Sequence, residues 1–244
     1  VFLMNSSLTE ENLALSRKLI FGRGELVPVK TAENEFDGAP TSDRYPKEMY
    51  YRLLSPLILP RQVERVLYLD PDMLIINPLL PLWEQNLGGK VFAAAAHTGL
   101  TEMANEINQR RLDTEHEYFN SGVMLIDLKA ARSLVTAEDV FRCVGEHEKE
   151  LILPDQDVFN MLYGKQTLPV EDVLWNYDVR NYAKYLIRSS GSHDLNWVMD
   201  NTAVLHFCGK NKPWHADYKN PFGMLYLHYQ NLTLRKLGQK PDTP

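Results

Sequence analysis

The sequence is poor in cysteine, in long apolar runs and in positive charge. Its two cysteines, Cys143 and Cys208, each lie within an apolar run, so they give no disulfide framework and fit a reducing, cytoplasmic location. No apolar stretch approaches the roughly 18 residues of a membrane-spanning helix. The formal net charge of −6 argues against a nucleic-acid partner. No internal repeat, low-complexity tract or glycine-rich phosphate loop near the N-terminus is present.

What the chain does contain is an ordinary globular composition and an alternating pattern of elements. Of its 244 residues, 44% are hydrophobic and 24% are charged. Patterns typical of strands alternate with patterns typical of helices, which predicts an α/β domain with a mainly parallel central sheet. We expect residues 1–220 to form this domain and residues 221–244 to form a helical tail.

The most informative segment is an apolar strand that ends in two carboxylates. Val66 to Leu69 are predicted to form a buried strand, and Asp70-Pro71-Asp72 follows directly. Ligands of α/β sheets bind beyond the carboxyl ends of strands. Pro71 restricts the turn, so that both carboxylates can face one point. Paired carboxylates suit Mg²⁺ or Mn²⁺, which commonly bridge to substrate phosphates.

Taken alone, the Asp-x-Asp pattern is weak evidence. With this content of aspartate, roughly one such tripeptide is expected by chance, and a second, Asp155-Gln156-Asp157, is present. A solvated turn after a strand explains Asp70 and Asp72 equally well. Asp155 is equally explained as the N-cap of the helix that follows it.

Other polar residues lie in segments that are otherwise apolar. Arg52 belongs to a predicted helix at 47–54, which Pro56 and Pro60 should end, and it is either a surface charge or a ligand. Asn120 and Gly122 open a predicted strand and indicate special backbone geometry or close approach to a ligand. A long helix is predicted over residues 130–149.

A basic and glycine-containing segment follows the last predicted strand. His206 lies in the apolar strand, where a lone histidine is more often a core residue than a ligand. Gly209 and Lys212 come shortly after it and make a phosphate neighbourhood plausible. Asp70, Asp72, His206 and Lys212 together could therefore hold a divalent ion and a diphosphate.

Five motifs in this order resemble glycosyltransferase family 8. This is the retaining group that includes glycogenin and bacterial lipopolysaccharide galactosyl- and glucosyltransferases. The resemblance covers nearly the whole chain and rests on these segments: Tyr51-Arg52-Leu53-Leu54, Val66 to Asp72, Asn120-Ser121-Gly122-Val123, Leu153 to Asp157, and His206-Phe207-Cys208-Gly209-Lys210-Asn211-Lys212-Pro213-Trp214.

The resemblance implies a GT-A fold that binds a UDP-sugar, such as UDP-glucose or UDP-galactose, through Mn²⁺ or Mg²⁺. By similarity, Asp70, Asp72 and His206 would ligate the metal, with Asp70 also near the ribose. Gly209 and Lys212 would hold the diphosphate. The donor sugar and its anomeric carbon would be surrounded by Arg52, Asn120, Asp155 and Gln156, of which Asp155 and Gln156 are the expected catalytic residues.

The expected activity is transfer of a hexosyl group to a saccharide or glycolipid acceptor, in bacterial cell-surface polysaccharide synthesis. Gln156 is a neutral amide and therefore a poor nucleophile. Retention of the anomeric configuration is thus better explained by attack of the acceptor on the same face of the sugar from which the diphosphate leaves. The family has an earlier strand carrying uridine contacts, which we expect to be missing before Val1. A nucleotide-sugar-binding protein without transfer activity is therefore the main alternative, and a nucleotidyltransferase is a weaker one.

The tail has two interpretations. Residues 221–240 mix apolar and aromatic side chains with Arg235, Lys236 and Lys240. This composition fits a peripheral membrane contact, and equally a helix packed on the protein, which we favour.

Overall fold

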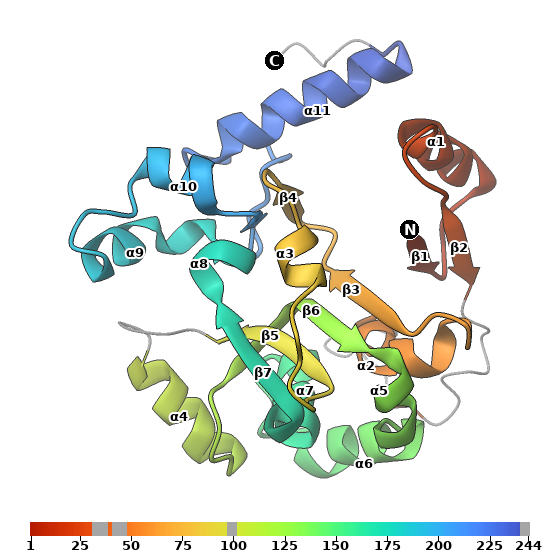
Figure 1. Ribbon diagram of the computed structural model, residues 1–244, viewed down its shortest axis with the longest axis vertical. Helices are drawn as coiled ribbons and strands as arrows, with labels where there is room; N and C mark the ends of the chain where they lie inside the picture. Colours follow the sequence, from red (N-terminus) through yellow and green to blue (C-terminus); the bar gives the residue numbers. More distant parts are fainter. Residues whose placement is uncertain (31–38, 41–47, 97–101, 240–244) are drawn as a thin grey trace. The chain divides into compact units, whose positions relative to one another are not determined.

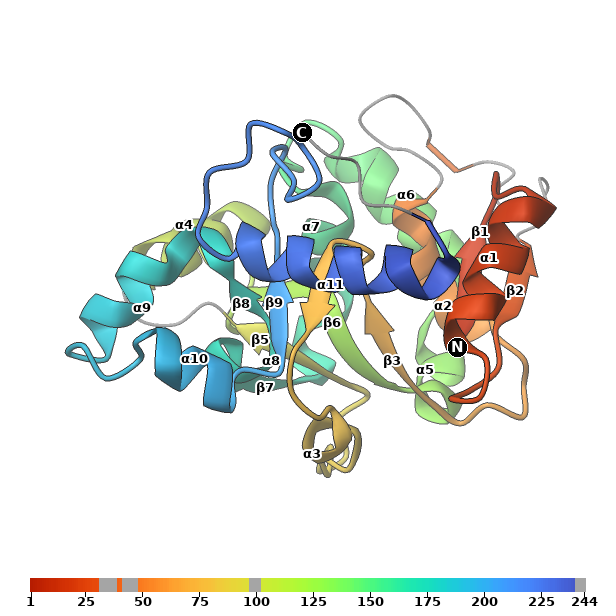
Figure 2. The ribbon, with the colours of Figure 1, turned by 90° about the horizontal axis from the view of Figure 1, so that it is seen from above.

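The computed structural model describes residues 1–30, 39–40, 48–96 and 102–239, with side chains omitted for 102–105 (Figure 1). The chain divides into two compact units. One consists of Val1–Asp37 with Gly209–Pro244, and the other of Gly38–Cys208. Figure 2 shows the elements of both units in a view turned by 90°. The predicted division at residue 220 stays a prediction, and most of the polar loop at 31–41 lies outside the described residues.

The larger unit is built around a four-stranded sheet with the order β3-β6-β5-β7. Its strands are β3 (Arg65–Leu69), β5 (Phe92–Ala96), β6 (Phe119–Asp127) and β7 (Thr167–Glu171). β5 and β7 pair in parallel, and β6 pairs antiparallel with both β3 and β5. Three of the four strands thus run the same way, as a mainly parallel sheet requires, and β6 is the reversed one.

The predicted strand at Val66–Leu69 exists, but it is less buried than expected. β3 lies at one end of this sheet's strand order, and all five of its residues are half-buried. The central positions belong to β5, whose five residues are all buried, and to β6.

A second, three-stranded sheet lies beside the first. Its order is β4-β9-β8, formed by Met73–Ile75, Val204–His206 and Tyr177–Asp178. An apolar cluster of Leu82, Val123, Ala203 and Val204 contains residues of both sheets, because Val123 belongs to β6 and Val204 to β9. The two sheets therefore share a core at the turn that joins β3 to β4.

Helices pack against the first sheet. α5 contacts β3 and β6, and α7 contacts β6, where Phe159 packs edge-on against Phe92 of β5. The helices of this unit are α2 (Met49–Ile58), α3 (Leu80–Trp83), α4 (Glu102–Leu112), α5 (Leu128–Leu134), α6 (Ala137–His147), α7 (Pro154–Tyr163), α8 (Asp172–Trp175), α9 (Tyr182–Arg188) and α10 (Leu195–Asn201), with short 3-10 turns at Gly164–Gln166 and Val179–Asn181.

The prediction that Pro56 ends its helix is wrong. α2 runs through Pro56 to Ile58. Proline has no N–H to donate to the carbonyl of Arg52 one turn earlier. The Ser55 hydroxyl donates to that carbonyl at 3.1 Å and so replaces the missing hydrogen bond.

The single helix predicted over residues 130–149 is two helices. α5 ends at Leu134 and α6 begins at Ala137. Thr136 has extended backbone and its hydroxyl accepts from the amide of Asp139, which makes it the N-cap of α6.

The smaller unit contains β1 (Phe2–Asn5), α1 (Glu10–Ile20), β2 (Val27–Lys30) and α11 (Gly223–Leu237). β1 pairs in parallel with β2, and α11 packs against α1. Lys236 donates to the Leu19 carbonyl at 2.6 Å. The tail is thus helical and packed, as we favoured, although this packing does not test contact with a membrane. Across the described residues, no helix has both the length and the apolar character needed to cross a bilayer.

Candidate active site

The two carboxylates at the end of β3 lie on a turn that is held from both sides. The Asp70 amide donates to the Gly122 carbonyl of β6 at 2.9 Å. The Asp72 carbonyl accepts from the Phe207 amide, just after β9, at 3.0 Å. The turn is thereby fixed between the two sheets, and the alternative of a loose solvated turn does not describe it.

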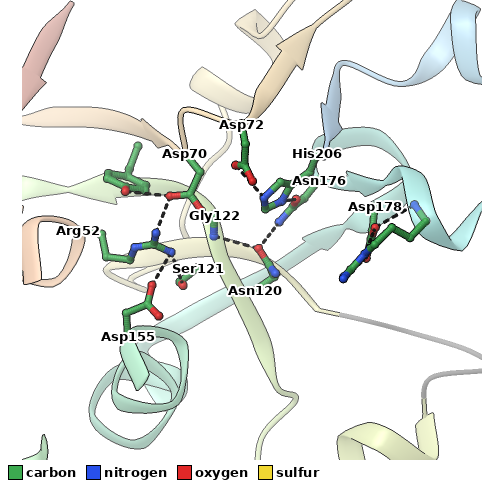
Figure 3. A network of polar contacts seen from close by, with 12 residues as sticks. Arg52, Asp70, Asp72, Asn120, Ser121, Gly122, Asp155, Asn176, Asp178 and His206 are labelled. Carbon is green, nitrogen blue, oxygen red and sulfur yellow. Dashed lines mark hydrogen bonds and ion pairs between the residues drawn. The ribbon is translucent and has the colours of Figure 1, made fainter. Parts of the chain in front are cut away.

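His206 brings a nitrogen ligand to the same place. It pairs with Met73 where β9 runs beside β4, and only 5% of its surface is exposed. One ligand atom from each of Asp70, Asp72 and His206 lies within 4.8 Å of the other two. The imidazole Nε2 lies 3.2 Å from Asp72 Oδ1 (Figure 3). The three predicted metal ligands are therefore together in space.

The donor set and its spacing fit a divalent cation. Neighbouring ligands of an octahedral Mg²⁺ ion lie about 3 Å apart, as follows from its usual bond lengths. The Nε2–Oδ1 separation is close to this value. Carboxylate oxygens with one imidazole suit Mn²⁺ or Mg²⁺ better than a thiolate-binding metal.

Arg52 joins this cluster to the start of α7. Its guanidinium donates to Asp70 Oδ1 at 2.6 Å, to Ser121 Oγ at 2.8 Å, and pairs with Asp155 Oδ2 at 2.8 Å (Figure 3). Its side chain is 15% exposed. Burial would lower the pKa of Arg52, but Asp155 and Asp70 outweigh it and raise that pKa. The surface-charge interpretation of Arg52 is therefore wrong.

Tyr68 is a second donor to Asp70. Its hydroxyl lies 2.9 Å from Oδ1, and Arg52 stands 5.3 Å from the centre of its ring. Burial raises the pKa of Tyr68, so the hydroxyl keeps the proton that it donates. Burial also raises the pKa of Asp70, and Arg52 acts in the opposite direction. Since Oδ1 accepts both hydrogen bonds, Oδ2 is the oxygen better placed for a cation.

The second Asp-x-Asp segment forms the first turn of α7. The helix begins at Pro154 with Leu153 as its N-cap, so the N-cap interpretation of Asp155 is wrong. Asp155 turns instead to Arg52, while Gln156 is buried, with 7% of its surface exposed.

Asp157 anchors this turn. It is fully buried, and its carboxylate accepts from Arg111, from the Tyr118 hydroxyl at 2.5 Å, and from the amides of Ile152 and Leu153. Burial would raise the pKa of Asp157, but these hydrogen bonds outweigh it and lower that pKa. Asp157 therefore holds the first turn of α7 in place, and this turn carries Asp155 and Gln156.

Two asparagines complete the cluster. Asn120 Oδ1 accepts from the Gly122 amide at 2.9 Å and from Asn176 Nδ2 at 2.7 Å. Asn176 Oδ1 lies 2.8 Å from His206 Nδ1. Asn176 is a residue of this cluster that was not predicted from the sequence. The available signal was a polar residue between Trp175 and Tyr177, which the structure buries to 2% exposure.

Gly209 and Lys212 belong to the smaller unit, which begins again at Gly209. Gly209 has a φ of +92°, a left-handed conformation that favours glycine. Lys212 lies in the turn that follows, where its amide faces His215. Diphosphate binding by these two residues stays a prediction.

The model of the family described as "Glycosyl transferase family 8" matches residues 3–218. The chain is 32% identical over 215 residues to general stress protein A of Bacillus subtilis, covering 85% of this chain and 74% of that protein. It is 27% identical to a lipopolysaccharide 1,2-glucosyltransferase of Escherichia coli, covering 84% of this chain and 59% of the relative.

Among solved structures, the galactosyltransferase LgtC in complex with donor and acceptor sugar analogues is similar over the whole chain. The TM-score is 0.76 at 25% identity, and the match covers 86% of LgtC. The fold and site thus define a glycosyltransferase of the GT-A fold. The chain belongs to glycosyl transferase family 8 and is a hexosyltransferase by class.

Proposed function

We propose that this protein is a metal-dependent, retaining hexosyltransferase that takes its sugar from a UDP-sugar. The observation that carries the proposal is the convergence of Asp70, Asp72 and His206 on one point, with Arg52 bridging Asp70 to Asp155. The chain spans little more than half of the lipopolysaccharide glucosyltransferase named above, so the acceptor of that enzyme is a guide to class only.

In this proposal the donor diphosphate faces the carboxylate cluster. Asp70, Asp72 and His206 would hold Mn²⁺ or Mg²⁺, which when bound supplies positive charge to the departing UDP. From the resemblance alone, Gly209 and Lys212 are also proposed to bind diphosphate. Arg52 keeps Asp155 oriented, and the buried Gln156 lies beside it on the first turn of α7.

The chemical role of α7 is to present oxygen atoms to the anomeric carbon. A sugar that loses its leaving group becomes oxocarbenium-like, and nearby carboxylate or amide oxygens stabilise that charge. Asp155 and Gln156 are the candidates. Gln156 is uncharged and Asp155 is engaged by Arg52, so neither is a strong nucleophile. We therefore favour attack from the departing face, with the leaving diphosphate accepting the acceptor's proton.

The acceptor is proposed to be a saccharide or glycolipid of a bacterial cell surface. One of the relatives named above, a lipopolysaccharide 1,2-glucosyltransferase of Escherichia coli, supports this class. Location in the cytoplasm and contact of α11 with a lipid surface stay predictions.

The test is binding and hydrolysis of a UDP-sugar panel with and without Mn²⁺. We expect metal-dependent binding with slow sugar release, both lost in Asp72→Ala. Asp200→Ala, which removes an exposed carboxylate of α10, is the matched control and should behave as wild type.

The possible outcomes separate the proposal from its alternatives. Full-strength binding without metal would contradict the metal site. Metal-dependent binding with neither hydrolysis nor transfer to any acceptor would favour the nucleotide-sugar-binding protein. Release of pyrophosphate from UTP when a sugar 1-phosphate is supplied in place of the UDP-sugar would indicate a nucleotidyltransferase.

A further inference from the structure

A chain of hydrogen bonds leads from the Gly122 amide through Asn120 and Asn176 to His206. The donor and acceptor of each bond can be assigned by starting at Gly122. The Gly122 amide lies 2.9 Å from Asn120 Oδ1. A backbone N–H can only donate, so the Asn120 atom that faces it is an acceptor. This contact fixes the orientation of the Asn120 amide.

The same reasoning fixes the next amide. Asn120 Oδ1 also lies 2.7 Å from the Asn176 side chain, whose facing atom must then be the donor, Nδ2. Asn176 consequently turns its own oxygen towards His206 Nδ1, at 2.8 Å. Since Oδ1 can only accept, Nδ1 carries the ring proton.

The consequence concerns the other ring nitrogen. In the neutral ring with its proton on Nδ1, Nε2 has a free lone pair, and this lone pair faces Asp72 Oδ1 at 3.2 Å. Two electron-rich atoms at that distance are complementary to a cation between them. The opposite tautomer would instead direct an N–H into the carboxylate cluster and block the nitrogen ligand.

We propose that Asn176 is a positioning residue that holds His206 in its Nδ1–H tautomer, and that Asn120 sets the orientation of Asn176. Histidines that bind metals commonly donate their other N–H to such an acceptor. Both Asn176 and His206 are almost fully buried, so water does not compete with this contact. The value of the arrangement for metal binding rests on the proposed function, whereas the tautomer itself does not.

The same path connects two parts of the site. Asn120 is a predicted contact of the donor sugar, and its oxygen is already engaged by Gly122 and Asn176. Its Nδ2 group is therefore the part that a sugar hydroxyl would meet. A substitution at Asn176 that removes its hydrogen bond to His206 is expected to affect the proposed metal ligand. A substitution that removes only its hydrogen bond to Asn120 is expected to affect the proposed donor contact.

The experiment measures the tautomer directly in metal-free protein. Histidines are labelled with ¹⁵N, and the ring nitrogens of His206 are assigned by comparison with His206→Gln. The spectra are recorded at a pH where the imidazoles are neutral. We expect wild-type His206 to be protonated on Nδ1, and Asn176→Leu to lose this preference. An unchanged His206 tautomer in Asn176→Leu would overturn the proposal.

Two further variants separate positioning from packing. Asn176→Asp keeps an acceptor for Nδ1–H but cannot donate to Asn120, so we expect the tautomer and Mn²⁺ affinity to be retained and the KM for donor to rise. Asn77→Ala removes an asparagine that donates to the Met199 and Thr202 carbonyls, remote from His206 in its contacts. It controls for lost stability and should leave the tautomer unchanged.

Mn²⁺ affinity is then measured by calorimetry on the same proteins. Asn176→Leu should bind Mn²⁺ about 10–100-fold more weakly than wild type. Equal Mn²⁺ affinity in the two proteins would contradict the positioning role. If wild type binds no Mn²⁺ at all, the proposed function fails, while the tautomer measurement still decides the assignment of Asn176.

Discussion

A Cβ atom added at Gly122 would lie 2.6 Å from Cε1 of His206. The missing side chain at Gly122 is thus what allows the imidazole to sit against β6, beside the turn of Asp70 and Asp72. The sequence indicated close approach at this glycine, and the approaching group is His206, one of the three proposed metal ligands.

Gly122→Ala is therefore expected to displace the His206 ring. Overpacking of this kind costs about 1–3 kcal/mol of unfolding free energy, and loss of ligand geometry should weaken Mn²⁺ binding by about tenfold or more. The measurements are chemical denaturation and calorimetric titration. Gly145→Ala in α6 is the control, because its Cβ would meet nothing within 4 Å. Unchanged Mn²⁺ affinity in Gly122→Ala would argue against the site.

Arg52→Lys tests the bridge between the metal cluster and α7. A lysine keeps the charge, but its single nitrogen replaces two guanidinium nitrogens, one of which contacts Asp70 while the other contacts Ser121 and Asp155. We expect kcat/KM to fall by roughly 10²-fold, as when an organising contact is misplaced. Arg142→Lys, at an exposed ion pair with Asp139, is the control and should leave both stability and kcat/KM essentially unchanged. Equal kinetics of Arg52→Lys and wild type would remove Arg52 from the site.

Asp157 predicts how stability depends on pH. Its pKa is lower in the folded than in the unfolded protein, so the unfolded chain takes up the proton first as the pH falls. The stabilisation is complete above the ordinary pKa of about 3.9 and is lost as the pH falls through the lower folded pKa. Asp157→Asn should unfold about 2 kcal/mol more easily at neutral pH, because it removes the charge from hydrogen bonds that Asp157 makes with half-buried Arg111 and with two backbone amides.

The measurement for Asp157 is denaturation across pH 7 to about 2. The difference in free energy of unfolding between wild type and Asp157→Asn should become smaller as the pH falls. A constant difference would show that the carboxylate's charge does not carry the stabilisation.

Gln156→Ala tests the mechanism of retention. If Gln156 supplies only an amide oxygen, its loss should lower kcat by roughly 10²-fold without abolishing transfer, and the product should keep the same anomeric configuration. Kinetics and product analysis by NMR measure both. A glycosyl adduct on Asp155 or Gln156, trapped with a slow donor and seen by mass spectrometry, would instead establish a covalent intermediate.

The sequence by itself determined the strand at Val66–Leu69, the turn after it, the strand with Asn120 and Gly122, and the family. These features depend on residues that are close together in the sequence or on the order of motifs along it, so the sequence alone is enough to predict them. The predicted helix boundaries were wrong where a side-chain hydrogen bond changed the local outcome. The Ser55 hydroxyl replaces the hydrogen bond that Pro56 cannot make, so α2 continues, and Thr136 caps α6, so a new helix begins there.

Only the tertiary structure decided how the polar residues pair. Arg52 and Asp155 are 103 positions apart in the sequence and yet form an ion pair at 2.8 Å, and no spacing rule reports such a contact. Asn176 shows the same limit, because its proposed role depends on the direction of its hydrogen bonds to Asn120 and His206. These bonds exist only once strands β6 and β9 and the end of helix α8 have come together. Residue types set which atoms could bind a cation, and the folded arrangement of the two sheets set which of them face one another.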